Sequence, residues 1–147
     1  MGPGQGAPAA LPSWAPMTQP RPLRILIAED DQSVAQLYRT YAEKRGHQVL
    51  LASDGAETLV TAAAELPDLV LLDVAMPKLD GRDVCRQLKQ NPKTAGIPIL
   101  VVSAMGGDQN MRAMLLELGA WDVVEKPVDL AVTFGKAERL VERARSG

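Results

Sequence analysis

Five short apolar runs recur along the chain, each followed by a segment with apolar residues at helical spacing. Runs that are apolar on both faces are typical of parallel strands covered by helices. Pro98 is compatible with a strand only near its start, because proline lacks the amide hydrogen that a central strand donates. The predicted strands are Arg24–Ala28, Gln48–Ala52, Leu69–Leu72, Ile97–Val102 and Trp121–Glu125.

The segments after these runs place apolar residues at helical spacing, in three of them at positions i, i+3, i+4 and i+7, which predicts amphipathic helices. Regular alternation of strand and helix favours a doubly wound α/β fold of the (βα)5 type with a five-stranded parallel sheet. The flavodoxin-like strand order 2-1-3-4-5 fits this pattern. The helical stripes are Val34, Leu37, Tyr38 and Tyr41; Leu59, Ala62, Ala63 and Leu66; Val84, Cys85 and Leu88; Met111, Met114, Leu115 and Leu118; and Leu130, Phe134, Ala137 and Val141.

Composition divides the chain into two parts. Residues 1–22 hold six prolines, three glycines and a single charge, Arg21. Such a segment buries too little apolar surface to offset the entropy of ordering it, which predicts a disordered tail. Residues 23–147 then form one domain.

Charge and composition exclude several classes of function. The formal net charge of −2 gives no basic footprint for nucleic acid. No apolar stretch approaches the roughly 20 residues that cross a bilayer, and the N-terminus lacks a secretory signal. A single cysteine, Cys85, allows no internal disulfide, and a single histidine, His47, does not support a zinc site. A reducing cytoplasm is the expected compartment; Cys85 is expected to be a small buried residue on a helix, and His47 to be structural or exposed.

Polar side chains stand at or just after the ends of the predicted strands. Glu29 and Asp30 follow the first, Asp73 the third, Ser103 the fourth and Lys126 the fifth. In doubly wound sheets a ligand site forms outside the carboxyl ends of the strands, and the order 2-1-3 places the first and third side by side. The three carboxylates then meet and repel one another, so a cation or a raised pKa must relieve the repulsion. A hard divalent ion such as Mg²⁺ or Mn²⁺ is the natural candidate. By contrast, Asp31 is expected to cap the following helix.

Four motifs together resemble the receiver domain of two-component response regulators, the CheY-like family. DVAMPKLDG, which begins at Asp73, is similar to the family segment D-x-x-M-P-x-x-D-G. ILIAEDD resembles the first strand and its acidic pair, VVSAM the Thr/Ser-Ala element, and EKPV the Lys-Pro element. The resemblance spans about Leu23 to Arg145. It implies a phosphoacceptor of a phosphorelay rather than a conventional enzyme.

The resemblance assigns a role to each site residue. Asp73 would accept a phosphoryl group from a histidine kinase or phosphotransfer protein, with assistance from the domain itself in phosphorylation and dephosphorylation. Asp30, Asp73 and the main-chain carbonyl of Ala75 would bind the metal directly, and Glu29 would act mostly through metal-bound water.

Two further residues complete the set that the resemblance implies. Ser103 would donate a hydrogen bond to the phosphoryl group and Lys126 would supply positive charge. The family also has a cis peptide bond at the Lys-Pro step, here Lys126–Pro127. A downstream protein would bind the face formed by the last helix, strand and helix.

One position departs from the family. Receivers carry Tyr or Phe three residues before the lysine, and that ring moves inward on phosphorylation, whereas this chain has Val123. Trp121 is the nearby aromatic, and period-two alternation predicts that it shares a face with Val123. The usual coupling to the output face is therefore in doubt, although the site residues are complete.

Other functions stay open at this point. A receiver that acts by protein contact without phosphorylation is one alternative, and a fragment of a longer regulator with an output domain is another. A hydrolase that forms an aspartyl-phosphate is disfavoured because the chain leaves no room for a cap domain. A dinucleotide site is not supported, since no G-x-G-x-x-G follows the first strand.

Overall fold

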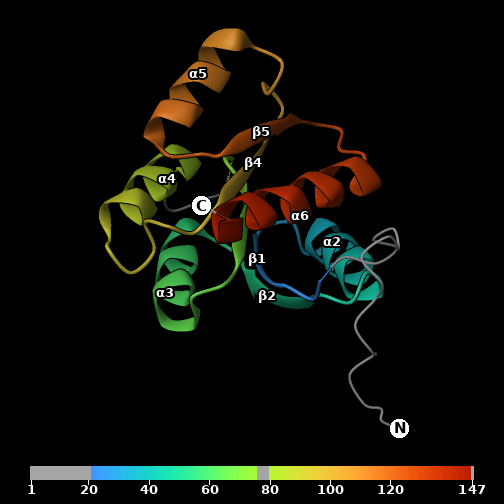
Figure 1. Cartoon of the computed structure of the whole chain (residues 1–147). Helices are drawn as coiled ribbons and strands as arrows, with labels where there is room; N and C mark the ends of the chain where they lie inside the picture. Colours follow the sequence, from blue (N-terminus) through green and yellow to red (C-terminus); the bar gives the residue numbers. More distant parts are fainter. Residues whose placement is uncertain (1–20, 76–79, 147) are drawn as a thin grey trace, which may run out of the picture.

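The computed structural model describes residues 21–75 and 80–146, and strands and helices alternate throughout these two segments (Figure 1). The predicted tail lies outside them except for Arg21 and Pro22, which are exposed, and so does the M-P-x-x part of the motif that follows Asp73. The elements are β1 (Arg24–Ala28), α2 (Gln32–Lys44), β2 (Gln48–Ala52), α3 (Gly55–Glu65), β3 (Leu69–Asp73), α4 (Gly81–Gln90), β4 (Ile99–Ser103), α5 (Gln109–Leu118), β5 (Asp122–Glu125) and α6 (Leu130–Ser146).

The strands form one parallel sheet in the order β2-β1-β3-β4-β5, which confirms the predicted fold and topology. β1 lies between β2 and β3, so that Ala28 is in register with both Ala52 and Leu72. The carboxyl ends of β1 and β3 are therefore adjacent, as the chemistry of the site requires.

Helices cover both faces of the sheet (Figure 1). On one face α3, α4 and α5 contribute Ala62, Val84 and Leu115 to an apolar cluster that includes Leu26 and Leu72. On the other face α2 and α6 form a second cluster with alternate residues of the same strands. Every residue of β3 and β4 is buried, which explains why these runs are apolar without interruption.

The strand ends differ slightly from the prediction. β3 extends to Asp73, while β4 covers Ile99–Ser103 and β5 covers Asp122–Glu125. Pro98 precedes β4, and its carbonyl oxygen accepts a hydrogen bond from the amide of Val70, 3.0 Å away. Trp121 precedes β5 and donates its amide hydrogen to the carbonyl oxygen of Ile99.

Two apolar residues assigned to helical stripes are not in the core. The side chain of Leu37 is 56% exposed, because α2 packs on the sheet through Ala35, Tyr38 and Ala42. Leu66 is 51% exposed and caps the end of α3 with a φ of 47°, so it leaves the helical stripe. No helix within residues 21–75 and 80–146 is long and apolar enough to cross a membrane.

Cys85 is buried, as predicted, and His47, for which the sequence left a structural or an exposed position open, is buried as well. Its Nδ1 accepts a hydrogen bond from the amide of Leu23, and its Nε2 lies 2.8 Å from Oε2 of Glu138. Arg45 donates its Nε hydrogen to the same carboxylate. This network joins the start of β1 and the end of α2 to α6.

Candidate functional site

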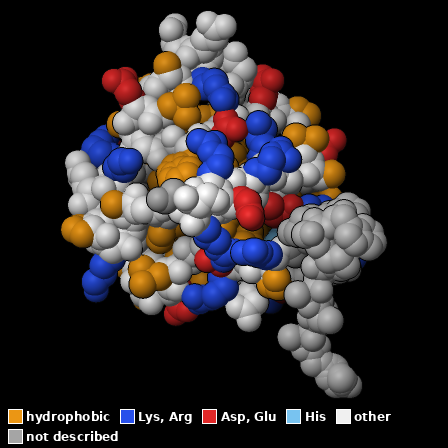
Figure 2. Space-filling model, in the orientation of Figure 1, with side chains coloured by type: hydrophobic (Ala, Val, Ile, Leu, Met, Phe, Trp, Pro, Cys, Tyr) orange, Lys and Arg blue, Asp and Glu red, His pale blue; other side chains and the backbone are white. Residues whose placement is uncertain are grey.

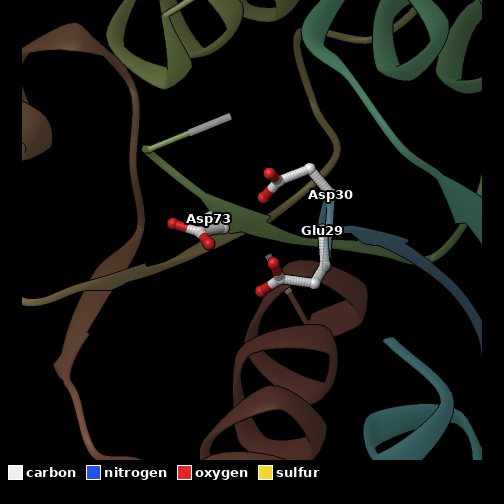
Figure 3. A group of neighbouring side chains, drawn as sticks. All are labelled: Glu29, Asp30 and Asp73. Atoms are coloured by element: carbon white, nitrogen blue, oxygen red, sulfur yellow. The ribbon is translucent and has the colours of Figure 1, made fainter. Parts of the chain in front are cut away.

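Three carboxylates meet at the carboxyl ends of β1 and β3. One oxygen of each of Glu29, Asp30 and Asp73 lies within 4.8 Å of the other two. Figure 3 shows Glu29 and Asp30 directing their carboxylates toward Asp73 from the end of β1. The amide of Glu29 continues the sheet by donating to the carbonyl of Ala52. The predicted juxtaposition of these three acids is present in the structure.

Asp73 is held at the centre of this group with its side chain 5% exposed. Its Oδ2 accepts a hydrogen bond from Nζ of Lys126 at 3.0 Å, and its Oδ1 accepts one from the amide of Ala75 at 3.0 Å. The Lys126–Pro127 peptide is cis, and the amide of Lys126 donates to the carbonyl of Ser103. The end of β5 thus brings a cation into contact with the central carboxylate.

Glu29 and Asp30 differ in environment although they are neighbours in sequence. Glu29 is 4% exposed, and its Oε2 accepts a hydrogen bond from the amide of Asp31. Burial, together with the charge of Asp73, raises the pKa of Glu29 to about 7. Asp30 is exposed to solvent. Asp31 caps α2 by accepting hydrogen bonds from the amides of Ser33 and Val34, as predicted.

Ser103 ends β4 and is buried on the side of the site formed by β5. Its Oγ accepts a hydrogen bond from the amide of Met105 at 3.0 Å. Because the hydroxyl is the acceptor in that bond, its own hydrogen stays available for a ligand. Its main-chain carbonyl accepts from the amides of both Gly106 and Lys126, at 3.1 and 2.9 Å.

A cavity of about 590 Å³ opens over the three carboxylates. Its lining includes Lys126 and Val128, which follow β5, and Asp31 and Tyr38 of the α2 region. Tyr38 was not predicted as a site residue, because its helical spacing marks it only as a core position. No pattern in one sequence tells how far a buried ring reaches toward a neighbouring site.

The group of donors fits a hard divalent cation. Carboxylate oxygens are the ligands that Mg²⁺ prefers, usually one or two of them together with water. Nζ of Lys126 contacts Asp73, but the charge of Lys126 does not offset the burial and the charge of Asp73 that raise the pKa of Glu29. A divalent ion offsets the remaining repulsion among the carboxylates.

Glycines allow two close approaches around the site. A Cβ on Gly81 would lie 2.4 Å from Cα of Val74, so the start of α4 packs against the backbone that follows Asp73. A Cβ on Gly106 would lie 2.9 Å from Cα of Glu125, so the loop after Ser103 lies directly on the backbone of β5. Larger residues at either position require the backbone to shift.

Val123 and Trp121 lie in different layers, so the prediction that they share a face is wrong. Val123 is 4% exposed and packs in the cluster formed with α3, α4 and α5. Trp121 packs against the cluster on the α2 and α6 side, and the guanidinium of Arg143 lies 5.9 Å from its ring centroid. Period-two alternation fails here because Trp121 precedes the strand. Trp121 therefore does not replace the missing ring at position 123.

The sheet order and the carboxylates, hydroxyl and lysine at its carboxyl edge define a flavodoxin-like α/β protein with an acidic site at the topological switch point. The sequence model of the response regulator receiver domain matches residues 25–137. The chain belongs to this family, as the sequence motifs indicated.

Curated relatives support this assignment. The chain is 38% identical to the response regulator PleD of Caulobacter vibrioides over 117 residues, which cover 80% of this chain and 26% of PleD. It is also 38% identical over 122 residues to the alkaline phosphatase synthesis transcriptional regulatory protein PhoP of Bacillus subtilis, covering 82% of this chain and 49% of PhoP. The chain thus spans about half of the length of PhoP and less of PleD.

Solved structures agree with the fold. A putative response regulator from Chloroflexus aurantiacus superposes with a TM-score of 0.77 at 30% identity, covering 83% of this chain and 99% of that one. The signal receiver domain of a signal transduction histidine kinase from Syntrophus aciditrophicus gives a TM-score of 0.75 at 32% identity, with 82% and 90% of the two chains covered.

Proposed function

We propose that Asp73 accepts a phosphoryl group from the phosphohistidine of a histidine kinase or phosphotransfer protein, and that the phosphorylated domain changes its binding to a downstream protein. The contact between Asp73 and Lys126, at 3.0 Å and beside two further carboxylates, is the observation that carries this proposal. A phosphorelay of this kind operates in the cytoplasm.

The proposed transfer needs no general base. A carboxylate oxygen of Asp73 forms a bond to phosphorus as the bond from phosphorus to the imidazole nitrogen breaks, and the imidazole takes up a proton as it leaves. As negative charge passes from the carboxylate to the phosphoryl oxygens, the ammonium group of Lys126 stabilises it there. Ser103 donates its free hydroxyl hydrogen to one of them. Positioning and charge neutralisation supply the catalysis.

Mg²⁺ or Mn²⁺ is the proposed cofactor. Asp30, Asp73 and the main-chain carbonyl of Ala75 would hold it directly, and Glu29 would hold it through water. When bound, the ion neutralises charge between the carboxylates and the incoming phosphoryl oxygens. The same residues would assist hydrolysis of the acyl phosphate, in which water attacks phosphorus and Asp73 leaves as the carboxylate.

The proposed output surface consists of α5, β5 and α6. Ser103 ends β4 and is followed by the loop that leads to α5, and Lys126 directly follows β5. The two residues proposed to contact the phosphoryl group therefore adjoin elements of this surface in the chain. Figure 2 shows Lys and Arg side chains mixed with Asp and Glu side chains in the middle of the view, where Figure 1 shows α6, so this surface offers both charges to a partner.

Buried Val123 favours a second candidate function, a receiver that binds its partner without phosphorylation, because the ring that normally reports phosphorylation is absent. Backbone amide NMR shifts with and without beryllofluoride, a phosphoryl mimic, distinguish the two. Shifts that extend from the site onto α5, β5 and α6 support the switch. Shifts confined to the loops around Asp30 and Asp73 favour the second function.

The central experiment is phosphorylation of the purified protein by acetyl phosphate and Mg²⁺, followed by intact-mass measurement. The wild type is expected to gain one phosphoryl group, and Asp73→Asn to gain none. Asp83→Asn is the matched control, because Asp83 lies on α4 in a surface ion pair with Arg86. Undiminished labelling of Asp73→Asn would end the assignment of the phosphoacceptor.

A further inference from the structure

Tyr38 brings a phenol to the edge of the acidic site from the middle of α2. Its side chain is 5% exposed and packs in the apolar cluster that contains Ile27 and Phe134. The same side chain lines the cavity over the carboxylates, together with Glu29, Asp73 and Lys126. The ring therefore belongs to the core, whereas its polar end faces the site.

The hydroxyl of Tyr38 has no hydrogen-bond partner among residues 21–75 and 80–146. Within the same residues, every side-chain nitrogen or oxygen that is fully shielded from solvent has a partner. The hydroxyl must therefore open into the cavity rather than end in the core. It is the kind of unused donor that an ordered water satisfies, and a cavity of about 590 Å³ whose lining includes carboxylates and Lys126 has room for several waters.

The surrounding charges keep this hydroxyl protonated. Burial, then the charge of Glu29 and then that of Asp73, raise the pKa of Tyr38 to about 12. A neutral phenol next to carboxylates acts as a hydrogen-bond donor. Glu29 is the better acceptor of the two, because both oxygens of Asp73 already accept hydrogen bonds from Ala75 and Lys126.

We propose that Tyr38 is a positioning residue for the metal site, whose hydroxyl donates through a water molecule to the carboxylate of Glu29. The hydrogen bond holds Glu29 in the orientation in which its second oxygen serves the hydration shell of the cation. This inference rests on the proposed function, since it assigns Glu29 to that shell. A water bridge is required because Tyr38 and Glu29 share no direct hydrogen bond in the structure.

Tyr38→Phe tests the proposal, because it removes only the oxygen and keeps the ring in the core. Tyr41→Phe is the matched control. Tyr41 lies one turn further along α2, with its ring 5.5 Å from that of Phe134 and below the guanidinium of Arg45, outside the site cavity. By calorimetric titration, Tyr38→Phe is expected to weaken Mg²⁺ binding about fivefold, the typical effect of one hydrogen bond. Tyr41→Phe should bind as the wild type does.

A second measurement needs no metal. In the metal-free protein with a chelator present, the carboxyl ¹³C shift of Glu29 is followed against pH by NMR. Loss of a donor to the charged carboxylate disfavours that charged form, so Tyr38→Phe is expected to move the midpoint of Glu29 upward, and Tyr41→Phe to leave it in place.

The outcomes separate this inference from the proposed function. If Tyr38→Phe bound Mg²⁺ with wild-type affinity and left the midpoint of Glu29 unchanged, the role of Tyr38 would be overturned. Equal losses of Mg²⁺ affinity in Tyr38→Phe and Tyr41→Phe would overturn it too, because they would report on packing alone. If the wild type itself bound no Mg²⁺, the proposed metal site would fail. The Glu29 midpoint would then still decide whether Tyr38 donates to Glu29.

Discussion

Glu29→Gln is expected to stabilise the metal-free protein at neutral and alkaline pH. Glu29 is 4% exposed and stands against two other carboxylates, so its charged form is disfavoured in the folded state. Burial, with the charge of Asp73 adding to it, raises the pKa of Glu29 from its ordinary 4.5 to about 7. Glutamine keeps nearly the same shape and removes the charge.

The sign and size of the effect follow from proton linkage. Between pH 4.5 and about 7 the folded protein keeps a proton on Glu29 that the unfolded chain has already lost. The free energy of unfolding therefore falls as pH rises through this window, by about 1.4 kcal/mol for each pH unit. The pKa difference corresponds to about 3 kcal/mol by pH 8, and the loss persists above that pH. Glu29→Gln avoids this loss of stability, because glutamine does not ionise.

Urea unfolding followed by circular dichroism, in a chelating buffer at pH 5 and pH 8, measures this difference. The variant and the wild type should be similar at pH 5, and the variant should be more stable at pH 8 by up to about 3 kcal/mol. Glu117→Gln, a change of an exposed residue on α5, controls for the loss of one charge. If the wild type and Glu29→Gln changed equally with pH, the explanation of this pKa would be wrong.

Three further changes test other contacts. Lys126→Ala removes the 3.0 Å contact with Asp73 and is expected to slow acetyl phosphate labelling about a hundredfold with an unchanged circular dichroism spectrum. Labelling at the wild-type rate would mean that Lys126 has no role in the transfer. Glu138→Gln should lower the free energy of unfolding by about 2 kcal/mol at pH 7, since it weakens the hydrogen bonds from Arg45. Against the effect of burial, those bonds hold the pKa of Glu138 below its ordinary value, so the deficit should shrink as urea unfolding is repeated at pH below 4.5. Val123→Phe adds volume to a buried site and should cost about 1–3 kcal/mol in urea unfolding while Asp73 is still labelled; an unchanged stability would mean that the cluster has spare room.

The fold was predictable because the sequence carries the same signal in each strand and helix. Runs such as Leu69–Leu72 are apolar on both faces, and in the structure every residue of β3 is buried. Glycine, proline and Asp31 mark where elements begin and end, since each acts through local backbone geometry. Errors appear where tertiary packing decides. Leu37 fits the helical spacing, but α2 contacts the sheet through a narrower stripe that leaves Leu37 56% exposed.

The acidic part of the site was equally predictable from the sequence, because strand order alone brings Glu29, Asp30 and Asp73 together. Two other features were not. Trp121 was placed on the wrong face because a strand boundary one residue away removes the alternation on which the prediction depended. The side chain of Tyr38 packs in the apolar core and also lines the site cavity. The spacing of residues along α2 predicts only the packing in the core.

The structure also limits which contacts can connect the site to the surface formed by α5, β5 and α6. Val123 is packed in the core and carries no ring that moves, so the connection through this position is absent. A different contact is present. The carbonyl of Ser103 accepts hydrogen bonds from the amides of Gly106 and Lys126, and the missing side chain of Gly106 lets the loop before α5 lie on the backbone of Glu125. In the proposed function, a movement of Ser103 toward a phosphoryl group would shift this shared carbonyl, which contacts both the loop before α5 and the residue that follows β5. The contact that the structure shows between Ser103 and the proposed output surface is therefore backbone packing around Gly106 rather than an aromatic side chain.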